Sequence, residues 1–449
     1  MTTTPLSAGV SRSRIDVIWI WFAVALLVMM IGRAVGPRIA DADQAARCVV
    51  NAHLPGPFGL SLNCDSPEFL RLAHTPSALL EPKNTRQARP GMIFLAAILA
   101  APLEPIAGLA RKMGTHAERS DIDPQRISNA IANFLPAFAA YIFLNVVLLA
   151  LSFYFLLKLV ERVGMPSERW GKLAVLSVAF LLFATYPVNT FLWTPHTQML
   201  NTLIPILAIY VALRAFDGAM ENLGFAIVMG LVVGLGNLSY GFFAILAPCL
   251  AVPALLRWLR DPRGSTFVRL AINFAVFAAL VILPYAIWYG IVVWKNGAFY
   301  HHEIEAFPQH TWVKTTLAQG FPVFWNRLVA WSYDLLENSV WQARALGVMT
   351  LWILIVWLLN RRPLGRSGPL VSLLVTAVLV SVLVYAFYLG VGLAAPRLAY
   401  SVVVPLIAGV VVIVARVADN LPARQSAVLA LGCAAIALER VIVALIYDL

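Results

Sequence analysis

The chain has 449 residues, of which 61% are hydrophobic and only 12% are charged, and its formal net charge is +11. A soluble globular protein carries about 25% charged residues, so this composition excludes a sizeable soluble domain and predicts an all-α polytopic membrane protein. The Lys and Arg residues fall in short segments between apolar runs, as the positive-inside rule requires, and therefore do not indicate nucleic-acid binding. We expect residues 1–449 to form one transmembrane domain.

Apolar runs of about the length needed to cross roughly 30 Å of hydrocarbon recur along the whole chain. The first run follows Arg12 and Arg14, and its apolar core is long for a signal peptide, so we expect an uncleaved anchor. No internal repeat is visible, and no pair of broken helices of the kind found in many transporters. The runs lie at about 16–35, 91–110, 134–157, 173–193, 198–213, 223–237, 240–258, 269–294, 346–359, 369–393, 398–415 and 425–446.

The run 91–110 decides the predicted topology. It contains Pro102, Glu104 and Pro105, which break a helix and place a carboxylate in its middle. If this run crossed the membrane with the N-terminus inside, most Lys and Arg residues of the later connecting segments would fall outside, against the positive-inside rule. We therefore expect a re-entrant or interfacial segment. That leaves eleven spanning helices, a cytoplasmic N-terminus and an extracytoplasmic C-terminus.

This topology has two long extracytoplasmic loops, 36–133 and 295–345, each too long to be a mere connection. Apolar residues at helical spacing in both loops predict interfacial helices, for example over 321–341. Cys48 and Cys64 share the first loop, where an extracytoplasmic environment would allow a disulfide; two free thiols are the alternative. We expect the functional site in these loops.

Asp65 is the preferred catalytic candidate. A carboxylate at the outer membrane face can accept a proton from a sugar or lipid hydroxyl as that hydroxyl attacks an activated carbon. The structural alternative is a helix N-terminus, with Asp65 or Ser66 as the cap and Glu68 at the capping-box position. Glu68 is also a candidate for substrate binding. Asp41 and Asp43 are alternate catalytic candidates just after the first apolar run, where a solvated loop start is the ordinary role of such residues.

Arginines near the predicted membrane surface are candidates for binding a phosphate. Arg86 and Arg89 lie in the sequence RQARPG, where each guanidinium group can bind two oxygens of a substrate phosphate. The alternative is that both side chains extend toward the phosphates of membrane lipids and bind no substrate. Arg397, in AAPRLAY, lies outside in the predicted topology and breaks the positive-inside pattern. We therefore favour binding of a phosphate leaving group by Arg397, with Tyr400 beside it.

Two further polar stretches are candidates for substrate contact. The stretch WTPHTQMLN offers His196 and Gln198 to a sugar or acceptor site, although an aromatic-belt Trp followed by a helix N-terminus is the simpler interpretation. The stretch HHEIE, 301–305, resembles a metal site, but adjacent helical residues point in different directions and a metal needs three or four converging ligands. We expect a solvent-exposed loop there, with His302 or His310 reaching a substrate, and no metal.

The nucleotide-binding motifs are missing from the sequence. It contains no Gly-rich phosphate-binding loop followed by Lys and Ser or Thr, and no dinucleotide-binding fingerprint. We therefore do not expect ATP to drive the reaction, and a cytosolic nucleotide sugar is not the expected donor. We expect no cofactor and no nucleic-acid partner.

The order of these features resembles the GT-C superfamily, integral-membrane glycosyltransferases that take a sugar from a polyprenyl-phosphate donor outside the cytoplasm. The matching features are an Asp followed by an interfacial helix (DSPEFLRLA, 65–73), an Arg-Pro entry to a juxtamembrane apolar segment (RQARPGM, 86–92), a late outer Arg at a helix start (PRLAY, 396–400) and paired helices at 223–258. In order and topology the resemblance covers most of the chain.

The resemblance implies that Asp65 is the general base and that Arg397, with Arg89, binds the lipid phosphate. Several members carry a second acidic residue where the fourth spanning helix begins, but that position here reads WTPHTQ, and Ser66 follows Asp65 where an acidic pair is usual. We therefore expect inverting, metal-independent transfer of a sugar to a lipid or glycan acceptor. The expected location is a bacterial-type inner or plasma membrane, with the active site extracytoplasmic and in contact with membrane lipids.

Other functions remain open from the sequence. A glycan ligase of the O-antigen type would depend on Arg and His residues in a late outer loop, which here offers His301, His302 and His310. A transporter or flippase of lipid-linked sugars is a second alternative, although the scarcity of charge within the apolar runs counts against ion coupling. A non-catalytic assembly subunit is a third.

Overall fold

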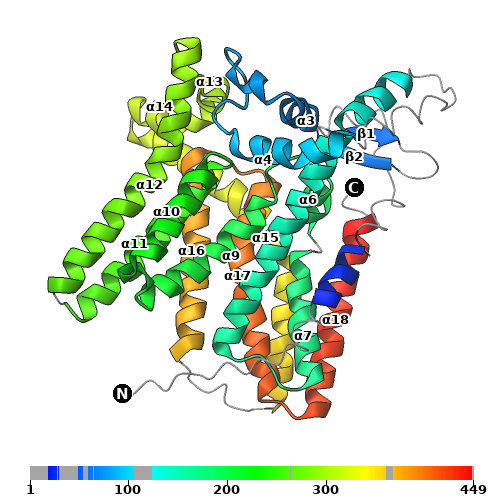
Figure 1. Ribbon diagram of the computed structural model, residues 1–449. Helices are drawn as coiled ribbons and strands as arrows, with labels where there is room; N and C mark the ends of the chain where they lie inside the picture. Colours follow the sequence, from blue (N-terminus) through cyan, green and yellow to red (C-terminus); the bar gives the residue numbers. More distant parts are fainter. Residues whose placement is uncertain are drawn as a thin grey trace.

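The computed structural model describes residues 19–27, 29, 49–53, 59–63, 65–105, 124–183, 185–262, 264–360 and 368–446. Helices dominate these ranges, and the strands in them form one short antiparallel hairpin, in which Val49 pairs with Asn63 and His53 pairs with Gly59. The all-α class is therefore confirmed (Figure 1). The elements are β1 (Val49–His53), β2 (Gly59–Asn63), α3 (Ser66–His74), η2 (Pro76–Leu80), α4 (Gly91–Ala100), η3 (Ala101–Leu103), α6 (Pro124–Val163), α7 (Arg169–Ala179), η4 (Phe180–Leu182), α8 (Tyr186–Leu192), α9 (Leu200–Phe216), η5 (Ala219–Glu221), α10 (Leu223–Asn237), η6 (Gly241–Ile245), α11 (Leu246–Arg260), α12 (Gly264–Asn296), α13 (His302–Ala306), η7 (Pro308–Thr311), α14 (Trp312–Ala318), α15 (Phe321–Asn360), α16 (Gly368–Val391), α17 (Pro396–Asp419) and α18 (Ala423–Ile446).

Seven helical segments in the described ranges are long and apolar enough to cross a membrane. A helix needs about 20 apolar residues to cross roughly 30 Å of hydrocarbon. The prediction of a polytopic membrane protein is therefore confirmed. The segments are Phe134–Val163, Gly241–Arg260, Thr266–Asn296, Phe321–Asn360, Gly368–Val391, Pro396–Asp419 and Ala423–Val443.

The predicted count of eleven spanning helices is not supported. The run 173–193 is interrupted, since α7 ends at Ala179 and α8 begins only at Tyr186. Helices α9 and α10 have 17 and 15 residues. At 1.5 Å per residue they are about 25 and 22 Å long, shorter than the roughly 30 Å of hydrocarbon. The first run, 16–35, is described only over residues 19–27 and at 29, so it does not enter the count.

Helix α15 joins two elements that we predicted to be separate, an interfacial helix over 321–341 and a spanning helix over 346–359. It is one helix of 40 residues, about 60 Å long at 1.5 Å per residue. No proline follows Pro322 before the helix ends at Asn360, so nothing interrupts its backbone hydrogen bonds. About half of α15 therefore extends beyond a hydrocarbon layer of roughly 30 Å.

Several short helices gather at one end of the bundle, the upper end in Figure 1. There α4, only 10 residues long, packs against α3 and α6, and α13 and α14 lie at the same end. Residues 106–110 lie outside the described ranges, so the re-entrant or interfacial placement of 91–110 stays a prediction. The described short helices nevertheless form a separate layer at this end of the bundle.

Helix α17 lies at the centre of the bundle, where 83% of its spanning segment is buried, and it packs against α6, α7, α9, α15 and α16. Helix α12 is the opposite case, with 17% of its segment buried and its main contact on α10. A helix that is apolar on all sides belongs either in a bundle interior or in lipid, so composition alone does not separate the two. One hydrophobic cluster extends from Phe22 to Ala437 through the described residues.

Candidate active site

A cavity of about 600 Å³ lies where the start of α3, helix α13 and the start of α17 come together. We call this space the Asp65 cavity. It gathers Asp65, Arg86, Arg89, His196, Gln198, His302 and Arg397, all of which the sequence predicted as site residues. Its other polar lining residues are Thr197, Asn237, Tyr240, Tyr285, His301, Glu303, Gln309, His310 and Tyr388.

Some predicted site residues lie elsewhere. Glu68 forms a two-bond ion pair with Arg71, with both contacts at 2.9 Å, and is not among the described residues that line the Asp65 cavity. Tyr400 is fully buried in the core, where its hydroxyl donates to the carbonyl oxygen of Leu182 at 3.3 Å. The predictions made for Asp41, Asp43, Cys48 and Cys64 fall outside the described residues.

Asp65 directly precedes α3, yet within the described structure its side chain makes no capping hydrogen bond. Its backbone N–H donates to Asn63 Oδ1 at 2.9 Å, which fixes the turn between β2 and α3. The carboxylate instead lies 2.9 Å from Arg86 Nη2 and 3.4 Å from His196 Nε2, and the side chain is 39% exposed. Asp65 therefore occupies the N-cap position of α3 without capping it through its side chain, and its carboxylate faces the cavity.

His196 is a buried ring whose orientation is set by its neighbours. The side chains of Phe69 and Phe191 flank it, with ring centroids at 5.1 and 5.2 Å. The backbone N–H of Thr197 donates to His196 Nδ1 at 2.9 Å. Nδ1 must then be the unprotonated nitrogen, so the neutral ring carries its proton on Nε2. That N–H donates to the Asp65 carboxylate.

The electrostatics of this pair favour an ionised acid and a neutral imidazole. The hydrogen bond from His196, with the charges of Arg86 and Arg397, lowers the pKa of Asp65 to about 2. Burial lowers the pKa of His196 to about 4 because it disfavours the charged ring, although the nearby carboxylate acts in the opposite direction. At neutral pH the Asp65 carboxylate is therefore balanced by arginine and not by a charged histidine.

Two arginines of the cavity already have carboxylate partners. Arg86 pairs with Asp65, and Arg89 Nη2 lies 2.9 Å from Glu303 Oε1. The predicted solvent-exposed loop at 301–305 is instead the short helix α13, whose Glu303 is only 5% exposed. Among the described residues, no group of three His, Cys, Asp or Glu side chains is arranged to hold a metal. Glu303 serves as the counter-ion of Arg89.

Arg397 differs from both of these arginines. It follows Pro396 at the start of α17, and its side chain lines the cavity. Among the described residues it forms no ion pair, and its Nε, like that of Arg86, is buried and has no hydrogen-bond partner there. A buried donor without a partner costs free energy that an anionic ligand would recover. Arg397 is therefore the arginine of the cavity best suited to receive a phosphate.

Gln87 is a positioning residue that the sequence analysis missed. It is fully buried, and its Nε2 donates to the carbonyl oxygens of Leu79 and Glu81 at 3.1 and 3.2 Å. Its Oε1 accepts from the backbone N–H of Tyr300 at 2.9 Å, and Trp288 Nε1 donates to its carbonyl oxygen at 2.7 Å. These bonds connect the segment before α4 to α12 and to the segment that follows α12. The only sequence signal was its position between the two arginines of RQAR.

Polar residues inside apolar runs position the other side of the cavity. Asn145 Nδ2 donates to three carbonyl oxygens at the end of α8, at 2.9 to 3.2 Å, just before His196. The hydroxyl of Tyr388 donates to Asn201 Oδ1 at 2.8 Å, and Asn201 Nδ2 donates to Gln198 Oε1. An Asn in a spanning helix is costly unless it is bonded, so Asn145 was a signal that could have been used.

The Arg-Pro-Gly sequence has a local packing reason. The backbone N–H of Gly91 donates to the carbonyl oxygen of Leu238 at 2.9 Å, at the start of α4. A Cβ on Gly91 would overlap Ser239 Oγ, so only glycine allows this close approach of two backbones. The contact joins α4 to the turn after α10 and holds the two arginines before it at the cavity.

No protein-family model matches this chain, and no curated protein or solved structure matches it. The fold and the site therefore define a class and not a family. The class is a polytopic α-helical membrane protein with a charged cavity at one end of its bundle. Its function has to be argued from the chemistry of that cavity.

Proposed function

We propose that the protein is a membrane glycosyltransferase of the GT-C type, which moves a hexose or pentose from a polyprenyl-phosphate donor to a lipid or glycan acceptor. The Asp65 cavity would be its active site, on the extracytoplasmic face, with the N-terminus cytoplasmic. The observation that carries the proposal is that Asp65 and Arg397, far apart in the sequence, line one cavity of about 600 Å³. Transfer from an anionic leaving group requires a base and a cation in one space.

The proposed reaction makes one bond and breaks one. The acceptor hydroxyl gives its proton to the Asp65 carboxylate while its oxygen bonds to the anomeric carbon. The bond between that carbon and the phosphate oxygen breaks on the opposite face, so the configuration inverts and polyprenyl phosphate leaves. Phosphate leaves readily as an anion and needs charge neutralisation more than a general acid. Arg397, with Arg89, supplies that positive charge in the proposal.

In the proposed resting state of the site, before the donor binds, Asp65 is paired with Arg86. A carboxylate whose pKa is about 2 is a weak base while it keeps this partner. The oxygens of an anionic donor compete with Asp65 for the Arg86 guanidinium. Loss of the partner raises the pKa of Asp65 and makes it a stronger base, while the N–H of His196 holds the carboxylate in place.

The test is sugar transfer by purified, lipid-reconstituted protein supplied with a set of polyprenyl-phosphate sugars. Asp65→Asn keeps the size of the side chain and removes the base, so the rate should fall by about 10²- to 10⁴-fold. Glu68→Gln is the matched control, because Glu68 lies on the adjoining helix, is partly exposed and is absent from the described lining of the cavity. An Asp65→Asn rate within tenfold of the unchanged protein contradicts the proposal.

A second candidate is a glycan ligase of the O-antigen type. It is favoured by one observation: His301, His302 and His310 all line the Asp65 cavity. Burial lowers the pKa of His310, so its ring is neutral and able to accept a proton at physiological pH. Sugar transfer that survives Asp65→Asn but is lost in His302→Ala or His310→Ala favours the ligase over the glycosyltransferase.

A further inference from the structure

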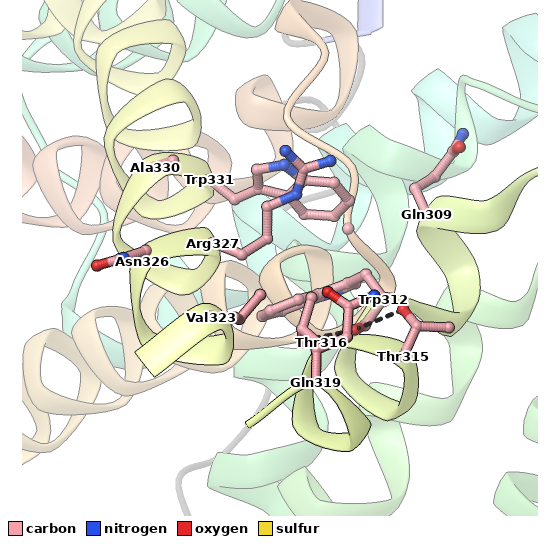
Figure 2. Close-up of a pocket in the computed structure, with 11 residues that line it drawn as sticks. Gln309, Trp312, Thr315, Thr316, Gln319, Val323, Asn326, Arg327, Ala330 and Trp331 are labelled. Atoms are coloured by element: carbon pink, nitrogen blue, oxygen red, sulfur yellow. Dashed lines mark hydrogen bonds between the residues drawn. The ribbon is translucent and has the colours of Figure 1, made fainter. Parts of the chain in front are cut away.

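A second pocket, with a volume of about 820 Å³, lies beside α14, α15 and the end of α16. Figure 2 shows side chains of α15 facing those of α14 across it. We call it the aromatic pocket. The lining residues that define it are Trp312, Thr316, Gln319, Arg327, Trp331 and Gly392.

Trp312 forms a fixed floor for the aromatic pocket. Its side chain is 4% exposed, and its ring stacks on Phe324 with centroids 5.5 Å apart and an interplanar angle of 6°. Its Nε1 donates to the carbonyl oxygens of Leu389 and Gly390 at 3.0 and 3.1 Å. The indole is therefore held by both α15 and the end of α16, which makes the pocket a preformed feature of the fold.

Trp331 forms a wall that depends on a glycine. Its ring lies 5.3 Å from that of Trp312, and its side chain remains partly exposed. Gly392 ends α16 with a φ of +69°, a conformation that favours glycine. A Cβ at Gly392 would overlap the Trp331 ring. Glycine is therefore the residue type that fits at position 392, where the Trp331 indole meets the backbone.

The polar lining of the aromatic pocket is almost uncharged. The hydroxyls of Thr315 and Thr316 donate to the carbonyl oxygen of Trp312 at 3.1 and 2.7 Å, which leaves their lone pairs able to accept hydrogen bonds. Gln319 adds an amide with both donors and an acceptor. Among the described residues that line the pocket, the one charged group is the guanidinium of Arg327, which lies 5.1 Å from the Trp331 ring centroid.

The aromatic pocket adjoins the Asp65 cavity. Gln309 lines both spaces, and Gly392 of the aromatic pocket lies between Val391 and Leu393 of the Asp65 cavity. The two spaces therefore lie side by side and share part of a wall.

We infer that the aromatic pocket binds the neutral saccharide part of the acceptor. A pyranose ring presents C–H groups on a face and hydroxyls around its rim, which fits indole walls rimmed by amides and threonine hydroxyls. A phospholipid headgroup is the competing ligand, but its phosphate would find one cation, and that cation already stacks on an indole. The inference deepens the proposed function, since it names the acceptor as a glycan.

The test measures saccharide binding without any transfer reaction. Full-length protein in lipid nanodiscs is titrated by calorimetry with linear tetrasaccharides of glucose, mannose, galactose or N-acetylglucosamine, and with glycerophosphoethanolamine as the headgroup probe. At least one tetrasaccharide should bind. Trp331→Ala should weaken its binding about tenfold, and Gln319→Ala, an exposed and unpacked position, should weaken it about threefold.

Two controls make the result specific. Trp325→Ala removes an indole that is 53% exposed on the same helix but is absent from the lining of the aromatic pocket, so it should leave the dissociation constant unchanged. Asp65→Asn should also bind the tetrasaccharide normally, so a failure of the glycosyltransferase proposal is distinguished from a failure here. The inference is overturned if no tetrasaccharide binds, or if only the headgroup probe binds. It is also overturned if Trp331→Ala and Gln319→Ala both bind the tetrasaccharide as tightly as the unchanged protein does.

Discussion

The Asp65 cavity and the aromatic pocket adjoin each other, yet their walls differ in kind. The first brings ionised groups from segments far apart in the sequence, and most of them are paired. The second is built mainly from one stretch around α14 and α15, and its lining has a single charge. Opposite charges in a partly buried space suit a reaction that develops charge, whereas indoles and amides suit recognition of a neutral ligand. In the proposed enzyme, chemistry and acceptor recognition would be divided between the two spaces.

The largest effect on stability is expected from breaking the Arg89–Glu303 pair. Glu303→Gln leaves the Arg89 guanidinium without its counter-ion in the wall of the Asp65 cavity. Removing one partner of a buried pair costs about 3 to 5 kcal/mol; because Arg89 is 27% exposed, we expect about 3 kcal/mol. The measurement is thermal unfolding in detergent.

Glu305→Gln is the control for that experiment, because Glu305 lies on the same short helix and is exposed. Its unfolding temperature should match that of the unchanged protein. Equal stability of the Glu303 and Glu305 variants contradicts the role of Glu303 as a counter-ion.

The second effect concerns pH. Because burial lowers the pKa of His196 to about 4, the folded chain stays unprotonated there, while the unfolded chain takes up a proton below about 6.5. Stability should therefore fall as the pH decreases from about 6.5 to 4, by at most roughly 3 kcal/mol from this residue. The unfolding temperature of His196→Gln, which cannot titrate, should fall less over that window. Parallel pH profiles of the two proteins would show that His196 is not buried as described.

The third effect separates Arg397 from an arginine at the other end of α17. Arg397→Gln removes a charged donor from the Asp65 cavity, and hydrogen bonds to charged groups contribute about 1.5 to 3 kcal/mol. Binding of farnesyl phosphate should therefore weaken by about 10- to 100-fold. Arg416→Gln, in the last turn of the same helix, should bind farnesyl phosphate normally. Similar affinities for the two variants contradict the assignment of Arg397 to the donor phosphate.

The smallest effect is expected at the boundary between the two spaces. Gly392→Ala forces the ring of Trp331 to move and places alanine at a φ of +69°, so we expect a stability loss of about 1 to 2 kcal/mol and weaker saccharide binding. Gly390→Ala is its control, since a Cβ there meets nothing within 4 Å. Farnesyl phosphate should bind to both variants equally. Loss of farnesyl phosphate binding in Gly392→Ala alone would show that the two spaces are one.

Hydropathy was sufficient to predict the class of fold, because a chain so poor in charge has to bury its helices in lipid or in one another. It was not sufficient to count the spans. Helices α9 and α17 are both strongly apolar, but α9 has only 17 residues and is too short to cross alone, which hydropathy by itself does not show. Hydropathy also does not show that α15 is continuous, because polar residues in its first half are equally typical of a separate interfacial helix.

The candidate site could be predicted in part, because several of its charged residues lie near predicted membrane surfaces and because Arg397 breaks the predicted positive-inside pattern. Their pairing could not be predicted. Nothing local in HHEIE shows that Glu303 turns inward toward Arg89, since that contact depends on the bond between Gln87 and Tyr300. The pairing of Asp65 with His196 likewise depends on where Asn145 holds the end of α8. Such contacts follow from tertiary packing and not from spacing.

The claim that Asp65 and Arg397 act on one donor is tested most directly by an experimental structure of the protein with farnesyl phosphate bound. The phosphate should lie in the Asp65 cavity within hydrogen-bond distance of the Arg397 guanidinium, with the Asp65 carboxylate facing the same space. A phosphate bound outside the cavity, or one that leaves Arg397 without contact, would contradict the claim.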